Sequence, residues 1–404
     1  MNIVIIGAGI GGLTAALCLE RAGHEVHIIE RAPEFLDVGA GIQCGANALC
    51  VMRYLGLLDE LRSLGVSPKG VEFRDYQSGK ALHSMTLGES YENQYGAPYL
   101  HLHRSDLHSV LLQAFLDKCP DGLTLNAGVE SYCEATESVK ILLSNGTHYE
   151  TQLLVGADGI NSVVRKQLLG NRPAKFTGNV AWRGIVPVER LPEGWMDTVV
   201  SNFVGPNKHM VLYYLRQKRL ANFVGVVENK QWTDSSWSAK APWQELRDDF
   251  KGWHSVVNDI IDALDKDNCY RWALYDHQPL SNWSSKRVTL LGDAAHAALP
   301  FMAAGAAMAI EDGRILQRAI DQASHQSLNQ AKPSDADLAE GLQLYQRNRF
   351  ERTSKIQATS ARVGRLYHFK NSLMRKAAFT ALKTFGAQQQ AYLPDYDANT
   401  VKLV

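Results

Sequence analysis

The sequence has no excess of charge of either sign and no long uninterrupted apolar run. Lys and Arg together number 42, as do Asp and Glu, so the formal net charge is zero. This balance gives no indication of a nucleic acid or an anionic membrane as a partner. No apolar run approaches the roughly 20 residues that a membrane-spanning helix needs. We therefore expect neither a nucleic-acid nor a membrane partner.

Cysteine is also scarce, with six residues among 404 and no CxxC pair. The apolar N-terminal run lacks the basic region and the small-residue cleavage site of a secretory signal. We therefore expect reduced thiols and a cytoplasmic location. His101, His103 and His108 lie close together in the sequence, but no set of cysteines or carboxylates accompanies them. No metal site is predicted.

Glycine, in contrast, is concentrated in a motif near the N-terminus. Gly7, Gly9 and Gly12 separate an apolar strand from a helical pattern. The first glycine permits a sharp turn, the second lets the backbone approach a pyrophosphate, and the third lets helix and strand pack closely. Glu30 ends the next apolar strand, at about the spacing of an acid that binds an adenosine ribose, and Arg31, which follows it, is also a cofactor-binding candidate. The motif predicts a bound dinucleotide, either NAD or FAD, without a ribose phosphate.

Two later segments also combine an apolar strand with an acidic turn. The first strand ends in Asp158, followed by Gly, and the second ends in Gly292 and Asp293. An Asp at the end of a buried strand is a strong acceptor for ribityl hydroxyl groups, and Asp293 is the candidate. A helix that starts near Gly305 and Ala306 would aim its free amide groups at the flavin N1–C2=O edge. If the dinucleotide is FAD, these segments would lie at its ribityl chain and its flavin.

Together, the three segments resemble the fingerprints of group A flavoprotein monooxygenases, the para-hydroxybenzoate-hydroxylase-like family. The resemblance spans roughly residues 1 to 365. It implies FAD as cofactor, NADH or NADPH as a transient electron donor, and O2 as co-substrate; the absence of a second GxGxxG agrees with transient binding of the donor. It also implies that Arg104 reaches the FAD ribose and pyrophosphate, and that Asp158 supports FAD. Ala304 departs from the Gln that the family often has near the flavin.

The expected fold is α/β. A Rossmann-like FAD-binding domain of the GR2 type carries an inserted, mostly antiparallel β-sheet substrate domain and a long C-terminal helix. The predicted division has three parts, namely an FAD-binding domain of 1–70, 101–175 and 284–365, a substrate domain of 71–100 and 176–283, and a C-terminal helical tail of 366–404.

Within the family, the segments 181–187, 273–280 and 292–312 look closest to salicylate, 3-hydroxybenzoate and 6-hydroxynicotinate hydroxylases. The resemblance therefore implies an enzyme that consumes NAD(P)H and hydroxylates a small hydroxylated aromatic acid through a flavin C4a-hydroperoxide. Two alternatives stay open, a monooxygenase of a larger polyketide or quinone-type substrate and a non-catalytic flavin- or NAD-binding regulatory module. The protein is expected to be a monomer or a homodimer.

His209 and Tyr213 are the catalytic candidates. They lie four residues apart on one expected strand and so face the same side. The run from His209 to Tyr214 also resembles the His-Met-x-x-Tyr-Tyr motif at the substrate of 6-hydroxynicotinate enzymes, which implies that His209 is a base or proton relay and that Tyr213 is its hydrogen-bond partner. An edge-strand histidine and a core tyrosine are the structural alternative. The candidate pocket residues are Tyr214, Arg183, Phe301 and Met302, with Arg183 as a possible carboxylate clamp.

Overall fold

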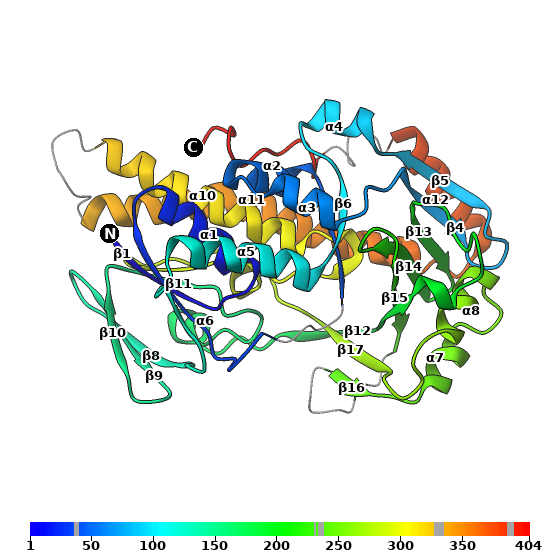
Figure 1. Ribbon diagram of the computed structural model, residues 1–404, viewed down its shortest axis with the longest axis horizontal. Helices are drawn as coiled ribbons and strands as arrows, with labels where there is room; N and C mark the ends of the chain where they lie inside the picture. The colour runs from blue at the N-terminus through cyan, green and yellow to red at the C-terminus, as the bar shows by residue number, and fades with distance from the viewer. Residues whose placement is uncertain (36–39, 230–231, 233–237, 327–334, 386–391) are drawn as a thin grey trace.

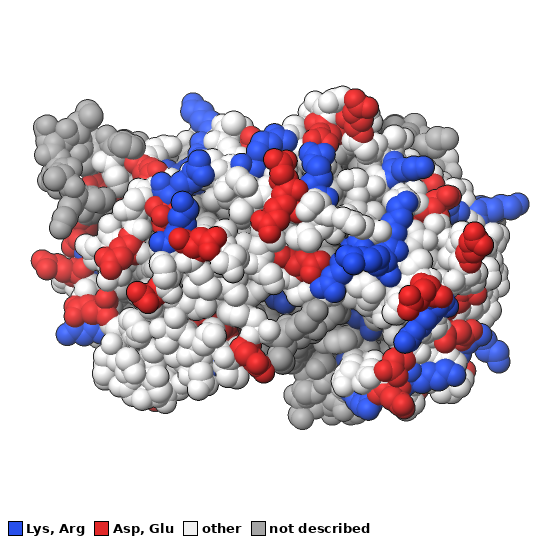
Figure 2. Space-filling view, in the orientation of Figure 1, with Lys and Arg blue, Asp and Glu red and all other residues white. Residues whose placement is uncertain are grey.

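The computed structural model describes residues 1–35, 40–229, 232, 238–326, 335–385 and 392–404. Its two largest sheets lie towards opposite ends of the long axis (Figure 1). On the face shown in Figure 2, acidic and basic side chains are intermingled. Among the described residues, no helix is long and apolar enough to cross a bilayer.

The first sheet has five strands, and every pair in it is parallel. Its central strands are nearly continuous apolar runs, as expected where helices cover both faces of a parallel sheet. In spatial order, the strands are β18 (Val288–Leu290), β11 (Leu153–Gly156), β1 (Asn2–Ile6), β2 (Glu25–Ile29) and β7 (Leu123–Thr124).

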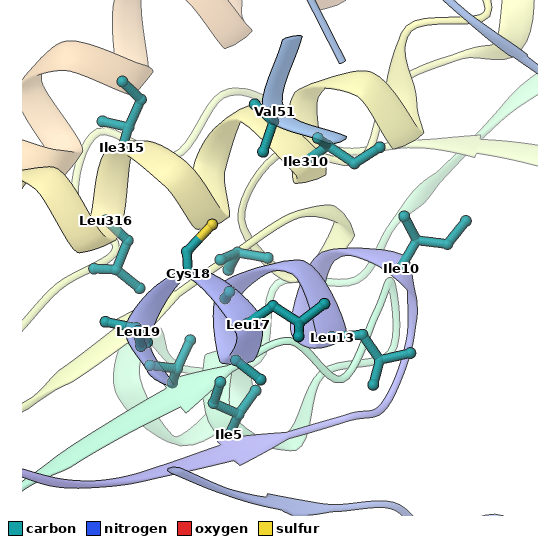
Figure 3. Packing of buried hydrophobic residues seen from close by; sticks show 14 of the residues in the cluster. Ile5, Ile10, Leu13, Leu17, Cys18, Leu19, Val51, Ile310, Ile315 and Leu316 are labelled. Atoms are coloured by element: carbon teal, nitrogen blue, oxygen red, sulfur yellow. The ribbon is translucent and has the colours of Figure 1, made fainter. Parts of the chain in front are cut away.

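Three helices pack together above this sheet. α1 (Ile10–Arg21) follows β1 and contacts both α5 (Arg104–Lys118) and α10 (Gly305–Gln326). Figure 3 shows Cys18 of α1 pointing towards α10, which carries Ile310, Ile315 and Leu316. A side chain at Gly313 would meet the backbone nitrogen of Ala15 at 2.7 Å. The close approach of α1 and α10 therefore requires glycine at this position.

α11 (Asp335–Tyr367) runs along α10 and is the long helix expected towards the C-terminus. The remaining helices of this half are shorter. They are α2 (Ala46–Leu55), α3 (Leu58–Leu64), α6 (Val163–Leu169) and α9 (Asp293–His296).

The second sheet has eight strands and is antiparallel except where β13 pairs with β4. One of its faces packs on α7 (Trp243–Asp249) and α8 (Ser255–Asp262) through the apolar cluster that contains Trp182, Phe223 and Phe250. In spatial order, the strands are β16 (Ser238–Lys240), β17 (Tyr270–Asp276), β12 (Lys175–Pro187), β15 (Leu220–Glu228), β14 (Lys208–Leu215), β13 (Val200–Gly205), β4 (Gly70–Asp75) and β5 (Ala81–Thr86).

Two small sheets complete the described strands. β3 (Gly41–Cys44) pairs with β6 (Leu100–His103) between the two large sheets. The other small sheet contains β8 (Val129–Glu134), β9 (Val139–Leu143) and β10 (His148–Thr151). The last elements are α4 (Glu89–Tyr95), α12 (Ser372–Phe385) and the short 3-10 helices Val188–Arg190 and Pro300–Met302.

The predicted fold class is confirmed, because a parallel sheet, a mostly antiparallel sheet and a long helix towards the C-terminus are all present. The division into domains stays a prediction. The expected helical tail differs in part, because α12 covers Ser372–Phe385 whereas residues 392–404 form turns and irregular chain. Residues 386–391 of that tail lie outside the described residues.

A fully buried network of charges joins α10 to α11. Arg349 Nη2 lies 2.8 Å from Glu311 Oε2, and Arg349 Nε lies 2.7 Å from Asp312 Oδ1. Asp312 also accepts hydrogen bonds from the backbone N–H of Gly292 (2.9 Å) and from His296 Nε2 (2.6 Å). Burial acts to raise the pKa of Asp312, but His296 and Arg349 outweigh it and lower that pKa to about 2. The charged network therefore anchors the turn after β18 to both long helices.

Replacing Arg349 by Met should destabilise the protein by about 3–5 kcal/mol, because Glu311 and Asp312 would keep their buried charge without this partner. The matched control is Arg62→Met. Arg62 pairs with Glu92 at 2.7 Å, but its side chain is 42% exposed, so its loss should cost at most about 1 kcal/mol. Urea unfolding of both variants measures the difference. Equal losses for the two variants would contradict a dominant role for the buried network.

Candidate functional site

A cavity of about 400 Å3 lies between the two large sheets. This volume falls in the usual range for small-molecule sites. One side of the cavity is formed by the N-terminal ends of α1 and α10 and by the turn after β18. The other side is formed by β12, β14 and β15 of the antiparallel sheet, and β3 closes one edge. Segments far apart in the sequence thus meet around one space.

The glycine motif forms the turn from β1 into α1. Gly7 has a φ of +105° and donates its N–H to Ile29 O at 2.8 Å. A Cβ on Gly12 would overlap the carbonyl oxygen of Gly7, so this glycine serves the packing of the turn on the helix. Gly9, which caps α1, lines the cavity and would carry a Cβ with no protein atom within 4 Å. The structure therefore leaves open space in front of the free amide groups of α1, where a phosphate would bind.

The turn after β18 presents a carboxylate to the same cavity. Gly292 has a φ of +62°, and Asp293 lines the cavity. Burial raises the pKa of Asp293, and the neighbouring His296 and Arg104 offset this only in part. The side chain of Asp293 is nevertheless accessible, because it faces the open cavity. The protein that surrounds this cavity is what raises the pKa. A carboxylate in this position is suited to accept hydrogen bonds from ligand hydroxyl groups.

The N-terminus of α10 lies on the same side of the cavity. Gly305 and Ala306 both line the cavity, and a Cβ on Gly305 would meet no protein atom within 4 Å. Just before them, Ala303 adopts a left-handed conformation with a φ of +50°. Such a conformation is costly for a residue other than glycine and is found preferentially at ligand sites. Arg104, at the start of α5, also lines this part of the cavity.

Glu30, the acid that follows β2, has a different environment. Glu30 accepts the N–H of Ala8 (2.9 Å) through Oε2 and the N–H of Ala32 (2.9 Å) through Oε1. It thereby ties the glycine turn to the end of β2. Glu30 and the exposed Arg31 are not among the residues that line the cavity. The structure therefore brings Glu30 to the turn but leaves the predicted contact of Glu30 and Arg31 with a cofactor as a prediction.

Asp158 also stands beside the cavity rather than in it. Its neighbours Ala157 and Gly159 line the cavity, whereas Asp158 Oδ2 accepts the N–H of Val163 at 2.7 Å, at the start of α6. Burial raises the pKa of Asp158. The carboxylate holds the turn that borders the cavity, and its support of FAD stays a prediction.

The alternation of β14 decides which of its side chains reach the cavity. His209, Val211 and Tyr213 line the cavity, as expected for residues two apart on a strand. Tyr214 points to the opposite face, donates to Met196 O at 2.9 Å and packs in the cluster on α7 and α8. The prediction that Tyr214 lines the pocket is therefore wrong, because adjacent strand residues face opposite sides.

Strand register brings further side chains to this face. β15 places Asn222 beside Tyr213, Val224 beside Val211 and Val226 beside His209. β12 then places Arg183 beside Val224, and all of these residues line the cavity. The result is an apolar floor of valines with polar groups at its edges. The lining residues that the sequence pattern did not predict include Asn222, Gln43, Val211, Val224 and Val226.

Two of the polar groups lack a full set of partners. Asn222 Oδ1 accepts the N–H of Gly41 at 2.9 Å, but Asn222 Nδ2 is buried without a hydrogen bond among the described residues. Arg183 Nε is also buried without a hydrogen bond among the described residues. The guanidinium of Arg183 lies 5.7 Å from the ring centre of Trp272. Buried donors without partners are costly. A ligand with oxygen acceptors would satisfy both groups.

Tyr213 lies against the backbone of β3. A Cβ on Gly41 would lie 2.5 Å from Tyr213 Oη, so glycine is needed for this ring position. The ring of His101 packs on the other side, with 4.7 Å between centroids. Burial raises the pKa of Tyr213 well above its usual value, and Arg183 and a hydrogen bond from Gln43 oppose the shift only in part. Tyr213 is therefore a neutral phenol that can donate or accept a hydrogen bond.

His209 is 2% exposed and neutral. Its Nδ1 lies 2.9 Å from His368 Nε2. Burial and the proximity of His368 hold the pKa of His209 well below its ordinary value. An uncharged imidazole at the cavity can accept a proton.

The apolar residues predicted near η2 (Pro300–Met302) lie behind the cavity. The Phe301 ring centre is 5.5 Å from that of His209, and Phe301 also packs against Gly364 of α11. Met302 packs in a cluster with Ala304 and Met308. Neither side chain is among those that line the cavity, contrary to the prediction. Phe301 instead supports His209 from behind.

Comparison with known proteins agrees with this geometry. A family model described as an FAD binding domain matches residues 1–340. The 6-hydroxynicotinate 3-monooxygenase of Bordetella bronchiseptica is 37% identical over 364 residues, which cover 89% of this chain and 90% of that protein. The 3-hydroxybenzoate 6-hydroxylase of Polaromonas naphthalenivorans is 35% identical over 369 residues, which cover 91% of this chain and 88% of that protein.

Solved structures show the same architecture. A substrate complex of salicylate hydroxylase has a TM-score of 0.82 at 26% identity and covers 98% of this chain and 96% of that chain. HpxO of Klebsiella pneumoniae, complexed with FAD and uric acid, has a TM-score of 0.82 at 25% identity with the same two coverages, 98% and 96%.

The open space at Gly9 gives a direct test of where FAD binds. Gly9→Val should fold with nearly unchanged stability, because its φ of −73° suits any residue and no protein atom obstructs the Cβ. The added methyl groups should nevertheless weaken FAD binding at least about tenfold by blocking the helix N-terminus. Titration of the FAD-free protein, followed by flavin fluorescence, measures this affinity.

The contrasting variant is Gly12→Val, which should lower the thermal unfolding midpoint because its side chain overlaps the backbone of Gly7. Wild-type affinity for FAD in the Gly9→Val protein would show that the cofactor does not bind against α1.

Proposed function

The chain belongs to the family defined by the FAD-binding domain, that of the flavin-dependent aromatic hydroxylases, and on this premise we propose that it uses FAD and NAD(P)H to hydroxylate a small hydroxylated aromatic acid. The single observation that supports the small acid is the form of the second half of the cavity. Valines form its flat apolar floor, and Arg183, Asn222, His209 and Tyr213 stand at its edges. This arrangement fits one aromatic ring that carries a carboxylate and a hydroxyl group.

We assign the cofactor to the other half of the cavity. The amide groups at Gly9 and Gly12 would bind the pyrophosphate of FAD, and Asp293 would bind the ribityl hydroxyl groups. Gly305 and Ala306 would present the N-terminus of α10 to the flavin, which favours a reduced, anionic flavin. Arg104, Glu30, Arg31 and Asp158 are retained as cofactor-binding candidates, the last three through the turns that they hold or adjoin. When bound, FAD supplies electron transfer from the nicotinamide and the activation of O2.

The chain's own residues prepare the ring for attack. A phenolate is far more nucleophilic at carbon than a phenol, so a base at the hydroxyl group accelerates the reaction. We assign this role to His209, because it is uncharged and lines the cavity. Tyr213 is assigned a hydrogen bond to the substrate oxygen, and Arg183 with Asn222 a set of donors to the carboxylate.

The electron donor, the location and the oligomeric state are part of the same proposal. NADH or NADPH would bind transiently at the surface, because the chain carries a single glycine motif of this type. We propose a cytoplasmic protein that acts as a monomer or a homodimer. A larger polyketide or quinone-type substrate fits less well. The strand register places Arg183, Asn222, His209 and Tyr213 around the valine floor, and these side chains limit the space for a substrate. A regulatory module is disfavoured by relatives that are monooxygenases.

The proposal is tested with the FAD-loaded protein and a panel of salicylate, 3-hydroxybenzoate, 4-hydroxybenzoate and 6-hydroxynicotinate. At least one acid should stimulate NAD(P)H oxidation and yield a hydroxylated product, identified by mass spectrometry. His209→Gln should lower the hydroxylation rate about 100-fold or more near neutral pH. The loss should diminish as the pH rises, because the substrate hydroxyl group then ionises without a base.

NAD(P)H oxidation without a hydroxylated product for every acid would contradict the proposed substrate class. A wild-type rate and pH profile in His209→Gln would exclude this side chain as the base.

The neighbouring tyrosines of β14 provide a matched pair of variants. Tyr213→Phe should lower the hydroxylation rate roughly tenfold, since one hydrogen bond to the substrate oxygen would be lost. Tyr214→Phe should leave the rate unchanged and cost only about 1 kcal/mol of stability through its bond to Met196 O. Steady-state kinetics and urea unfolding separate the two effects. Equal losses of rate in both variants would show that the face of the strand does not determine the site.

A further inference from the structure

A line of three side chains leads from the cavity to the surface. His209 on β14 lines the cavity, and its Nδ1 lies 2.9 Å from His368 Nε2, just after α11. His368 Nδ1 in turn lies 3.1 Å from Glu228 Oε1, at the end of β15. The side chain of His368 is 4% exposed, whereas that of Glu228 is 40% exposed. The line therefore begins in a buried site and ends in solvent.

We propose that His368 and Glu228 extend His209 into a proton path between the substrate hydroxyl group and solvent. This inference rests on the proposed function, in which His209 is the base. His368 and Glu228 do not line the cavity, so they act through His209 as positioning and relay residues. The His209–His368 bond joins residues 159 apart in the sequence. No local motif could have indicated it.

The carboxylate at the outer end fixes the tautomer of each ring. A charged Glu228 can only accept hydrogen bonds, so His368 Nδ1 must carry a proton and donate it. In a neutral His368, Nε2 is then an acceptor and takes the Nδ1–H of His209. This leaves a lone pair on His209 Nε2, the ring nitrogen that remains for the cavity. The hydrogen bond on one nitrogen of an imidazole thus determines the chemistry of the other.

The surroundings keep both rings uncharged. Burial lowers the pKa of His368, and Glu228 offsets this only in part. The ring centroids of Tyr367 and His209 lie 5.2 Å apart. Burial raises the pKa of Tyr367, so this side chain adds no charge. The 3-10 helix at Pro300–Met302 contributes the apolar Phe301. Arg375 of α12 donates to Phe369 O and Asp75 rather than to the line, and Lys208 of β14 donates to Asp249 O.

The proton balance of the path is complete. The substrate O–H bond breaks and its proton goes to His209 Nε2, while the Nδ1–H of His209 passes to His368 Nε2. The Nδ1–H of His368 then passes to Glu228, which exchanges it with solvent. Both rings are left with a proton on Nε2. Return of one proton in the opposite sense, to the hydroxylated product, restores the starting tautomers.

The tautomers can be observed without a substrate. The FAD-loaded protein is labelled with 15N at the side chains of its 13 histidines, and two-bond 1H–15N correlation spectra distinguish the two neutral forms. Signals are assigned from their loss in His209→Gln and His368→Gln. We expect His209 and His368 both to be neutral with the proton on Nδ1. In Glu228→Ala, the tautomer ratio of His368 should shift about tenfold towards Nε2–H, because a charge-assisted hydrogen bond is lost.

Glu245→Ala is the matched control, since Glu245 also lies in an ion pair, with Arg271 at 2.7 Å, and its side chain is 47% exposed. This variant should leave the His209 and His368 signals unchanged. A proton on His209 Nε2 in the wild-type protein, or no response to Glu228→Ala, would overturn the proposal. The spectra test the hydrogen-bond directions that the path requires, and the rate profile of His368→Gln separates a relay from a merely structural His368.

The kinetic consequence is measured with the acid of the panel that is hydroxylated. His368→Gln should move the acidic limb of the plot of hydroxylation rate against pH to higher pH by about one unit, with little change in KM. On that limb the rate at a given pH would then fall about tenfold. An unchanged profile would overturn the relay while leaving His209 as a possible base. The absence of hydroxylation with every acid would instead count against the proposed function, and the spectra would still decide the tautomers.

Discussion

The cavity depends on how Asp312 holds the turn between β18 and α10. This buried carboxylate binds the backbone N–H of Gly292 and the ring of His296, and it pairs with Arg349 of α11. The turn then presents Asp293 to the cavity, and the chain continues to the N-terminus of α10 on the same side. Because the network is shielded from water, each group in it depends on the others for compensation of its charge. A wall built in this way can hold backbone amide groups in a fixed position.

The opposite wall depends on a different constraint, the alternation and register of the antiparallel strands. β14 turns His209, Val211 and Tyr213 to the cavity, and its pairing with β15 adds Asn222 and two valines. A shift by one residue would exchange these side chains for those of the apolar cluster on α7 and α8. The chemistry of the site therefore depends on the same apolar pattern that specifies the sheet.

Much of the first wall could be predicted from the sequence, because its signals are local. A glycine motif between strand and helix, or Asp293 at the end of an apolar strand, requires no knowledge of distant contacts. The sequence misplaces Tyr214, because the resemblance to a motif does not show which face of the strand each of its residues occupies. Asn222 and His368 were missed because their roles arise from pairing across the sheet and from a contact with the segment after α11. A polar residue in an otherwise apolar strand is the one local signal that Asn222 offers.

The central claim is that one cavity brings FAD and a small hydroxylated aromatic acid together, with the hydroxyl group at His209. A crystal structure of the FAD-loaded protein with the acid that it hydroxylates tests this claim most directly. We expect the ring to lie on the valines of β14 and β15, with its hydroxyl oxygen within hydrogen-bond distance of His209 Nε2 and its carboxylate at Arg183. A ring bound elsewhere, or bound with its hydroxyl group away from β14, would contradict the account.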